Sequence, residues 1–171
     1  MEKKETIKAV TFVLCGSLLQ MFNGIGDGLW STITSIFGII LFFVGLSKLK
    51  DGLDEKGSSA VKLLIISAIL GGVGFIFELI PLVGGMIASI VLLVAFIVQL
   101  VGYIKLKSSG SIGENGKSGV NLLLIAMIVA AFASLVGIIP FLGGIVVSIS
   151  SFAGLLLVFF GWVKVQEGLV E

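Results

Sequence analysis

Side chains able to do acid–base, nucleophilic or metal chemistry are few in this sequence. It contains no histidine and no arginine, and its one cysteine, Cys15, lies in an apolar run. Histidine is the commonest general base and metal ligand, and arginine grips phosphates and carboxylates with paired hydrogen bonds. We therefore expect no catalytic residue, no metal site and no bound cofactor, and we expect Cys15 to be a small buried hydrophobe.

Glu78 is the ionisable residue with the strongest claim to a function. It lies inside an apolar run, three residues before Pro81. A carboxylate within a membrane is costly and typically functional, whereas one at the headgroup level is simply solvated. We favour the solvated carboxylate, because the depth of a charge in the bilayer decides its cost.

Three further polar residues accompany Glu78 as candidates for a polar pathway or vestibule: Gln20, Asp27 and Gln99. Gln20, Asp27 and Glu78 could together form an acidic vestibule that attracts cations, although Asp27 also suits turn chemistry. Gln99 would either line a path or bond a neighbouring helix, and interhelical bonding is the commoner use.

The hydropathy of the chain predicts the helices that position these polar residues. Of the 171 residues, 57% are hydrophobic and 12% charged, against about 45–50% and 25% in a soluble domain. Too few polar residues are present to cover a soluble globule, so the bilayer is the solvent that suits this chain. Six apolar runs are long enough to span it as helices: 7–22, 29–47, 61–80, 86–104, 119–139 and 145–163.

One pattern occurs three times along the chain. A shift of 59 residues places Pro81 on Pro140, and a weaker first copy aligns at a shift of 57. Each copy holds two of the apolar runs, which is typical of an internal repeat. The sequence thus predicts an all-α integral membrane protein with six transmembrane helices, built as three tandem parallel two-helix hairpin repeats. We expect a single domain over 1–171, with units of about 1–56, 57–115 and 116–171.

Proline and glycine recur between the two runs of the second and third units. Proline ends a helix because it lacks an N–H donor, and glycine permits a chain reversal because it accepts positive φ. The sequence therefore predicts structural turns at these residues: Pro81, Gly84, Gly85, Pro140, Gly143 and Gly144. A phosphate-binding loop would need Gly-x-x-x-x-Gly-Lys, which is absent.

Small residues also recur four positions apart, a spacing that lets helix backbones approach closely. The clearest pairs are Gly85/Ser89, Gly144/Ser148 and Ser67/Gly71, together with the series Ala126/Ala130/Ser134. We expect these residues to support tight helix packing, within one chain or between chains.

The eleven lysines all fall on the side of the termini and the two polar loops. Positive residues stay on the cytoplasmic side, so we expect a multi-pass protein of the cell (cytoplasmic or inner) membrane with both termini cytoplasmic. Tyr103 and Trp162 immediately precede this lysine level. Their rings are expected at the headgroups, where amphipathic aromatic side chains settle.

The stretch "GLSKLKDGLDEKG" is echoed at 102–107 and 161–168. This pattern resembles that of small prokaryotic multi-span membrane proteins of unknown function. The resemblance implies a six-span membrane fold and no known activity.

Two classes of function suit this sequence. The first is a non-enzymatic structural or accessory subunit that binds a membrane-protein partner or a second copy of itself, because the loops are short and small residues abound. The alternative is a small transporter or channel with a pathway near the pseudo-threefold axis, which requires a water-filled cavity. Membrane lipid is an expected contact, and the net charge of +1 gives no field for nucleic acid.

Overall fold

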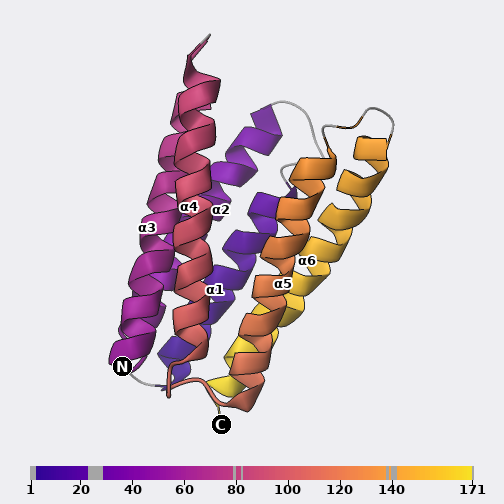
Figure 1. Cartoon of the computed structure of the whole chain (residues 1–171). Helices are drawn as coiled ribbons and strands as arrows, with labels where there is room; N and C mark the ends of the chain where they lie inside the picture. Colours follow the sequence, from indigo (N-terminus) through magenta and orange to yellow (C-terminus); the bar gives the residue numbers. More distant parts are fainter. Residues whose placement is uncertain are drawn as a thin grey trace.

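The computed structural model describes residues 3–22, 29–78, 80–81, 83–137, 139 and 142–170. This part of the chain contains six α-helices and no strand. The helices are α1 (Lys3–Phe22), α2 (Leu29–Lys50), α3 (Glu55–Glu78), α4 (Gly84–Lys107), α5 (Glu114–Val136) and α6 (Leu142–Gly168). Figure 1 shows them side by side, with both ends of the chain at the same end of the bundle.

The helices begin earlier than the apolar runs on the lysine side. Helix α3 begins at Glu55 and α5 at Glu114, several residues before their apolar runs. An acidic residue in the first turn is favourable next to the positive end of the helix dipole. Hydropathy marks only the part of a helix that suits lipid, so the polar first turns were missed.

Four of the described helices are long and apolar enough to cross a membrane, which indicates a membrane protein. These are Glu55–Glu78, Gly84–Lys107, Glu114–Val136 and Gly143–Gly168. Their outward faces carry large apolar side chains that a soluble protein would bury, including Ile90, Ile128 and Phe152, each more than 60% exposed. An apolar exterior of this kind is expected where lipid replaces water as the solvent.

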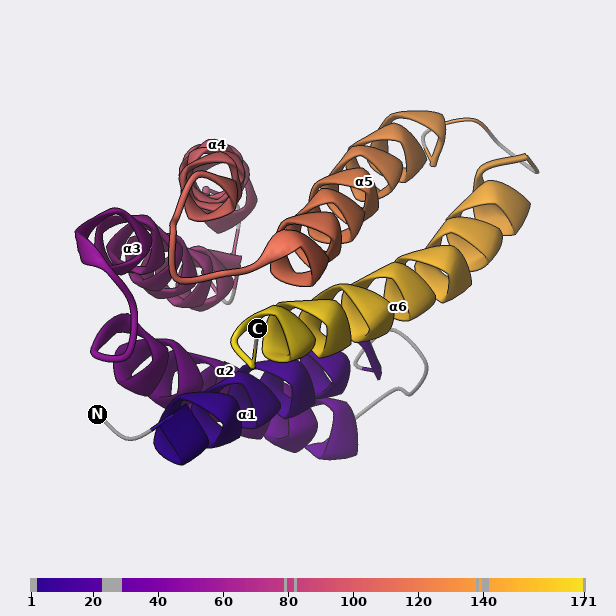
Figure 2. The ribbon, with the colours of Figure 1, turned by 90° about the horizontal axis from the view of Figure 1, so that it is seen from below.

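Sequential helices pack as pairs: α1 against α2, α3 against α4, and α5 against α6. Contacts between α2 and α3, α4 and α5, and α6 and α1 join the pairs into a ring. Viewed from below in Figure 2, the three pairs surround a common centre. Every helix therefore has one face toward this centre.

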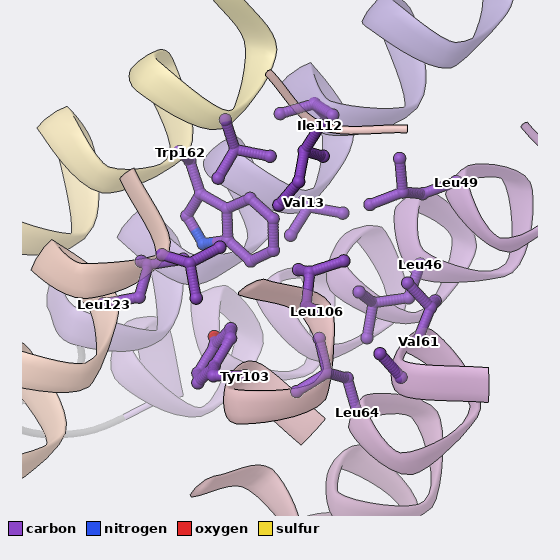
Figure 3. Close-up of a cluster of buried hydrophobic side chains, with 14 of the residues drawn as sticks. Val13, Leu46, Leu49, Val61, Leu64, Tyr103, Leu106, Ile112, Leu123 and Trp162 are labelled. Atoms are coloured by element: carbon purple, nitrogen blue, oxygen red, sulfur yellow. The ribbon is translucent and has the colours of Figure 1, made fainter. Parts of the chain in front are cut away.

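The hydrophobic core lies at the end of the bundle that carries the termini. Trp162, Leu46 and Leu106 are fully buried there, one from each helix pair. Ile112, from the loop between α4 and α5, is also buried among them, and Figure 3 shows these side chains converging. This cluster closes the lysine-bearing end, which we call the closed end.

The aromatic residues expected at the headgroups lie inside this core instead. Tyr103 is 4% exposed and Trp162 is fully buried, and their rings meet edge to face with centroids 6.1 Å apart. Nε1 of Trp162 has no hydrogen-bond partner in the described part of the chain. The prediction was wrong because distance along a helix fixes depth but not the direction in which a side chain points.

Loops fasten the closed end through Asp54, which lies between α2 and α3. Its carboxylate accepts hydrogen bonds from the Ser109 hydroxyl, from the Gly110 N–H at 3.0 Å and from the Gly57 N–H at 2.9 Å. The Asp54 N–H in turn donates to Oγ of Ser111 at 2.6 Å. The loop before α3 is thereby joined to the loop before α5, 55 residues further along the chain.

Two further hydrogen bonds connect the C-terminal part of α6 to its neighbours. The Gly113 N–H donates to the Gly168 carbonyl at 2.8 Å, and the Gln166 amide donates to Oγ1 of Thr11 at 3.3 Å. The closed end is thus held by hydrogen bonds between loops and helices as well as by apolar packing.

Burial raises the pKa of Asp54, but the hydrogen bonds from Ser109, Gly110 and Gly57 outweigh it and lower the pKa from 3.8 to about 2. A carboxylate whose pKa is lowered by folding stabilises the folded state above its unfolded pKa. That stabilisation is lost as the pH falls through the folded pKa. The Asp54 contribution is therefore complete above about pH 4 and declines toward pH 2.

We expect Asp54→Asn to lower the free energy of unfolding by about 1–3 kcal/mol, because an amide nitrogen then faces donors that had a carboxylate. Thermal unfolding in detergent at neutral pH measures this loss. Asp51→Asn is the control, since Asp51 is exposed and makes only a surface ion pair with Lys50 at 3.5 Å. The melting temperature of the wild type should fall more steeply than that of Asp54→Asn between about pH 4 and 2. Parallel pH profiles would contradict this role of Asp54.

Candidate functional site

A cavity of about 710 Å³ lies at the centre of the ring, above the closed end. All six helices contribute to its wall. Pockets that hold small molecules commonly measure about 300–1,000 Å³. The cavity therefore has the size of a binding site for one small solute.

The depth of the cavity follows from the helix segments that line it. On each of α3 to α6 the lining residues extend over twelve positions, whose ends are eleven helical steps apart, or about 16 Å at 1.5 Å per residue. These segments are Ser67–Glu78, Leu92–Tyr103, Leu123–Ser134 and Val147–Val158. The cavity thus reaches about halfway through a hydrocarbon layer about 30 Å thick.

The floor of the cavity is the hydrophobic core itself. Tyr103, Leu123 and Phe42 line the cavity and also belong to the buried cluster. Leu106 and Trp162 lie one turn or less beyond them, toward the closed end, and are fully buried. Within the described residues, the wall ends at the exposed Glu78 on the side of the turns, so the cavity is open toward that side and blocked toward the lysines.

Three of the four polar candidates come together in this cavity. Gln20, Glu78 and Gln99 all line it, from α1, α3 and α4. Asp27 lies outside the described residues. Glu78 is the last residue of α3 and is exposed. It therefore lies at the rim, whereas Gln99 lies near the floor, one turn from Tyr103.

Both glutamines have their amide groups engaged within their own helices. The Gln20 amide donates to the Gly16 carbonyl at 3.3 Å, and the Gln99 amide lies 3.4 Å from the Tyr103 hydroxyl. Among the described residues, Gln99 therefore makes no hydrogen bond to a neighbouring helix, which was the use that the sequence favoured. Its place in the cavity wall agrees with the other expectation, a residue that lines a path.

Small residues create the cavity, which the sequence did not indicate. Gly71 and Gly72 lie in its wall, and a Cβ atom added to either would meet no atom within 4 Å. Ser67, Ala130 and Ser134 line it as well. The four-residue spacing had predicted close helix contacts for them. Small side chains leave room whether or not a neighbouring helix fills it, and beside Gly71 and Gly72 none does.

Other glycines do bring helices together, at positions nearer the closed end. A Cβ atom at Gly119 would lie 2.4 Å from the Gly161 carbonyl oxygen, and one at Gly45 would lie 2.6 Å from the Val13 nitrogen. These contacts involve backbone atoms, which cannot move aside as a flexible side chain can. Close packing and cavity formation thus use different glycines.

The turn residues are placed differently from the prediction. Pro81 is exposed in the turn after α3, as expected, but Gly84 and Gly85 are the first residues of α4. Gly143 and Gly144 likewise belong to α6, and Pro140 lies outside the described residues. None of these four glycines has the positive φ that we had expected.

Close contact with the backbone explains why two of these positions are glycine. A Cβ atom at Gly84 would lie 2.0 Å from the Phe77 carbonyl oxygen, and one at Gly143 would lie 2.5 Å from the Gly137 carbonyl oxygen. Each glycine therefore lets the preceding chain cross directly over the start of the next helix. The glycine is required by this close approach rather than by a left-handed backbone.

The described residues contain no group of three or more potential metal ligands. Among the described residues that line the cavity, Glu78 is the only aspartate, glutamate or lysine. The remaining wall consists of apolar side chains, serines, the two glutamines and Tyr103. Such a wall can hold a solute and orient it.

Comparison of the chain with protein-family models, with curated proteins and with solved structures finds no match. The site is therefore interpreted from its own geometry.

We expect Gly71→Leu to fold like the wild type, because the added side chain enters open space and leucine favours a helix more than glycine does. Gly102→Leu is the matched control on α4, where a Cβ atom would already lie 2.7 Å from the Leu64 side chain. Overpacking of this kind costs about 1–3 kcal/mol. Melting temperatures in detergent compare the two variants. Equal destabilisation would mean that the space beside Gly71 is not open.

Proposed function

We propose that this chain is a non-enzymatic, six-span membrane protein that transports a small solute through a pathway near a pseudo-threefold axis. The observation that carries the proposal is the central cavity, which is open at one end and lined by Gln20, Glu78 and Gln99. A tightly packed accessory subunit has no use for such a space. A one-sided cavity above a closed core is what a transporter requires in one of its two access states.

Six spans are supported by the lengths and the arrangement of the helices. Helices α1 and α2 contain 20 and 22 residues, enough to cross about 30 Å. They lie alongside the four helices that are long and apolar enough to span. The ring is incomplete without them, because α2 contacts α3 and α1 contacts α6.

A threefold repeat is supported by the burial of equivalent positions in the three helix pairs. In the even helices, shifts of 57 and 59 residues relate Leu46 to Tyr103 and Trp162, all of them buried. In the odd helices, shifts of 51 and 59 relate three further buried residues, Val13, Leu64 and Leu123. The first hairpin is therefore six residues shorter between these layers, which explains why its sequence aligns less well. The same odd-helix shifts relate Gln20 to Gly71 and Ala130, all of which line the cavity.

The lysines give the orientation of this bundle. Lys48, Lys50, Lys105 and Lys107 all lie in the last turns of α2 and α4, at the closed end. The turns at the other end contain no lysine. By the positive-inside rule the closed end and both termini are cytoplasmic in a cell membrane, and the cavity opens to the opposite side.

Cysteine labelling tests whether the cavity admits water. The single cysteine, Cys15, is exposed rather than buried as the sequence had predicted, so we would first replace it with serine. Ala130→Cys places a thiol in the cavity wall, and Ile128→Cys places one on the outer face of the same helix, where Ile128 is 63% exposed. A thiol reacts as the thiolate, which requires water.

We expect a membrane-impermeant, positively charged methanethiosulfonate reagent, added to intact cells, to label Ala130→Cys at least about tenfold faster than Ile128→Cys. Labelling of Ala130→Cys only in inverted vesicles would reverse the orientation and leave the cavity intact. Failure to label it from either side, or equal rates for the two cysteines, would refute the proposal.

The accessory-subunit interpretation stays as a second candidate, because two small-residue pairs are unused within the chain. Gly85 and Gly144 are exposed, and a Cβ atom added to either would meet nothing within 4 Å. Ser89 and Ser148 follow them at four residues and are also exposed, with each hydroxyl bonded to the glycine carbonyl of its own helix. Such pairs allow another helix to approach closely.

This second candidate predicts that the protein purifies from native membranes in mild detergent with a stoichiometric partner or as a homo-oligomer. Replacing both Gly85 and Gly144 with leucine should then release the single chain, because the bulky side chains hold a partner helix away. Light scattering corrected for detergent measures the protein mass. A wild-type mass of 17.9 kDa, that of one chain, would exclude this candidate.

A further inference from the structure

The side chains around the cavity favour positive charge and disfavour negative charge. Glu78 places a carboxylate at the rim, and no lysine is among the lining residues. Both ion pairs of the described residues, Lys50–Asp51 and Lys117–Glu114, lie at the closed end. Because apolar walls focus the field of a charge, one carboxylate with no lysine among the described lining residues gives the cavity a negative potential.

Three serine hydroxyls of the wall offer acceptors to a solute. The hydroxyls of Ser17, Ser67 and Ser134 donate their protons to carbonyl oxygens of their own helices, at 2.8, 2.7 and 2.9 Å. What these hydroxyls can still present to a solute is oxygen lone pairs. The Gln20 amide, which donates one N–H to a carbonyl of its own helix, keeps a second N–H. The wall therefore contains donors as well as acceptors, and the carboxylate of Glu78 is the feature that distinguishes a cation from an anion.

Aromatic rings form a further part of the wall. Phe42, Phe75, Phe96 and Tyr103 line the cavity from α2, α3 and α4. The face of an aromatic ring attracts a cation within about 6 Å. Phe75 lies one helical turn below Glu78 on the same face of α3. A solute entering at the rim would therefore meet the carboxylate first and an aromatic ring next.

From this arrangement we infer that the cavity binds a monovalent organic cation with a large apolar surface. This inference rests on the proposed solute cavity and adds the chemical class of its ligand. Glu78 neutralises the positive charge, the rings of Phe75 and Phe96 contact its apolar groups, and the closed end stops it at mid-membrane depth. Inorganic cations are not favoured, since the wall offers one carboxylate and no cluster of ligands.

Tetraphenylphosphonium and tetraphenylborate test the inference, because the two ions have the same shape and opposite charge. The full-length protein would be placed in nanodiscs of phosphatidylcholine, which carries no net charge, and binding measured by equilibrium dialysis against empty nanodiscs. We expect saturable binding of one tetraphenylphosphonium per chain and no saturable binding of tetraphenylborate.

Glu78→Gln should weaken tetraphenylphosphonium binding by about tenfold, because the apolar walls of the cavity strengthen the attraction between the carboxylate and the cation. Glu55→Gln is the matched control, since Glu55 is an exposed glutamate at the opposite end of the same helix, and it should leave binding unchanged. Phe75→Leu keeps an apolar side chain but removes the ring, and should weaken binding by about two- to fivefold.

Saturable binding of tetraphenylborate as tight as that of the cation would overturn the inference. So would the absence of saturable cation binding, or equal affinities of wild type and Glu78→Gln. These failures differ from failure of the proposed function. If Ala130→Cys is labelled and the cation does not bind, the cavity stands and its ligand belongs to another chemical class.

Discussion

The packing at the closed end is the interaction on which the rest of this structure depends. A cavity about 16 Å deep among six apolar helices persists only where other contacts fix the helices, because lipid offers them no hydrophobic driving force toward one another. Here those contacts are the buried cluster around Trp162, Tyr103 and Leu106 and the glycines that bring helix backbones together. The Asp54 hydrogen bonds join the loops at the same end. Half of the bundle is thus rigidly packed so that the other half can stay open.

This division also constrains the mechanism. The core that forms the cavity floor blocks the way to the lysine-bearing end in the state described here. Transport in the proposed sense therefore requires the floor to open while the rim closes, which means relative movement of the three helix pairs. The contacts within each pair are more extensive than those between pairs. Movement of whole pairs is consequently the conformational change that breaks the fewest contacts between helices.

The sites of ligand contact and of proposed partner contact adjoin each other on this molecule. The cavity is lined by small residues of the odd helices, including Ser67, Gly71 and Ala130. Gly85 lies seven residues before the lining residue Leu92, and Gly144 lies seven before Ser151, so each is on the cavity side of its helix, nearer the turns. A partner helix bound at Gly85 and Gly144 would therefore lie beside the mouth of the cavity.

The sequence by itself determined the helical class, the positions of most helices and the residues at which a membrane function could be sought. Long apolar runs can satisfy their backbone hydrogen bonds in lipid only as helices or closed barrels, and these runs do not alternate. Gln20, Glu78 and Gln99 were identified as candidates because polar groups are costly in an apolar run, whatever surrounds them. Only the tertiary structure decided which way each residue points. It placed Tyr103 and Trp162 in the core, Cys15 on the surface, and Gly71 beside empty space. In a helix that is apolar on all sides, hydropathy does not distinguish the face toward lipid from the face toward its neighbours, so contacts between helices settle the orientation.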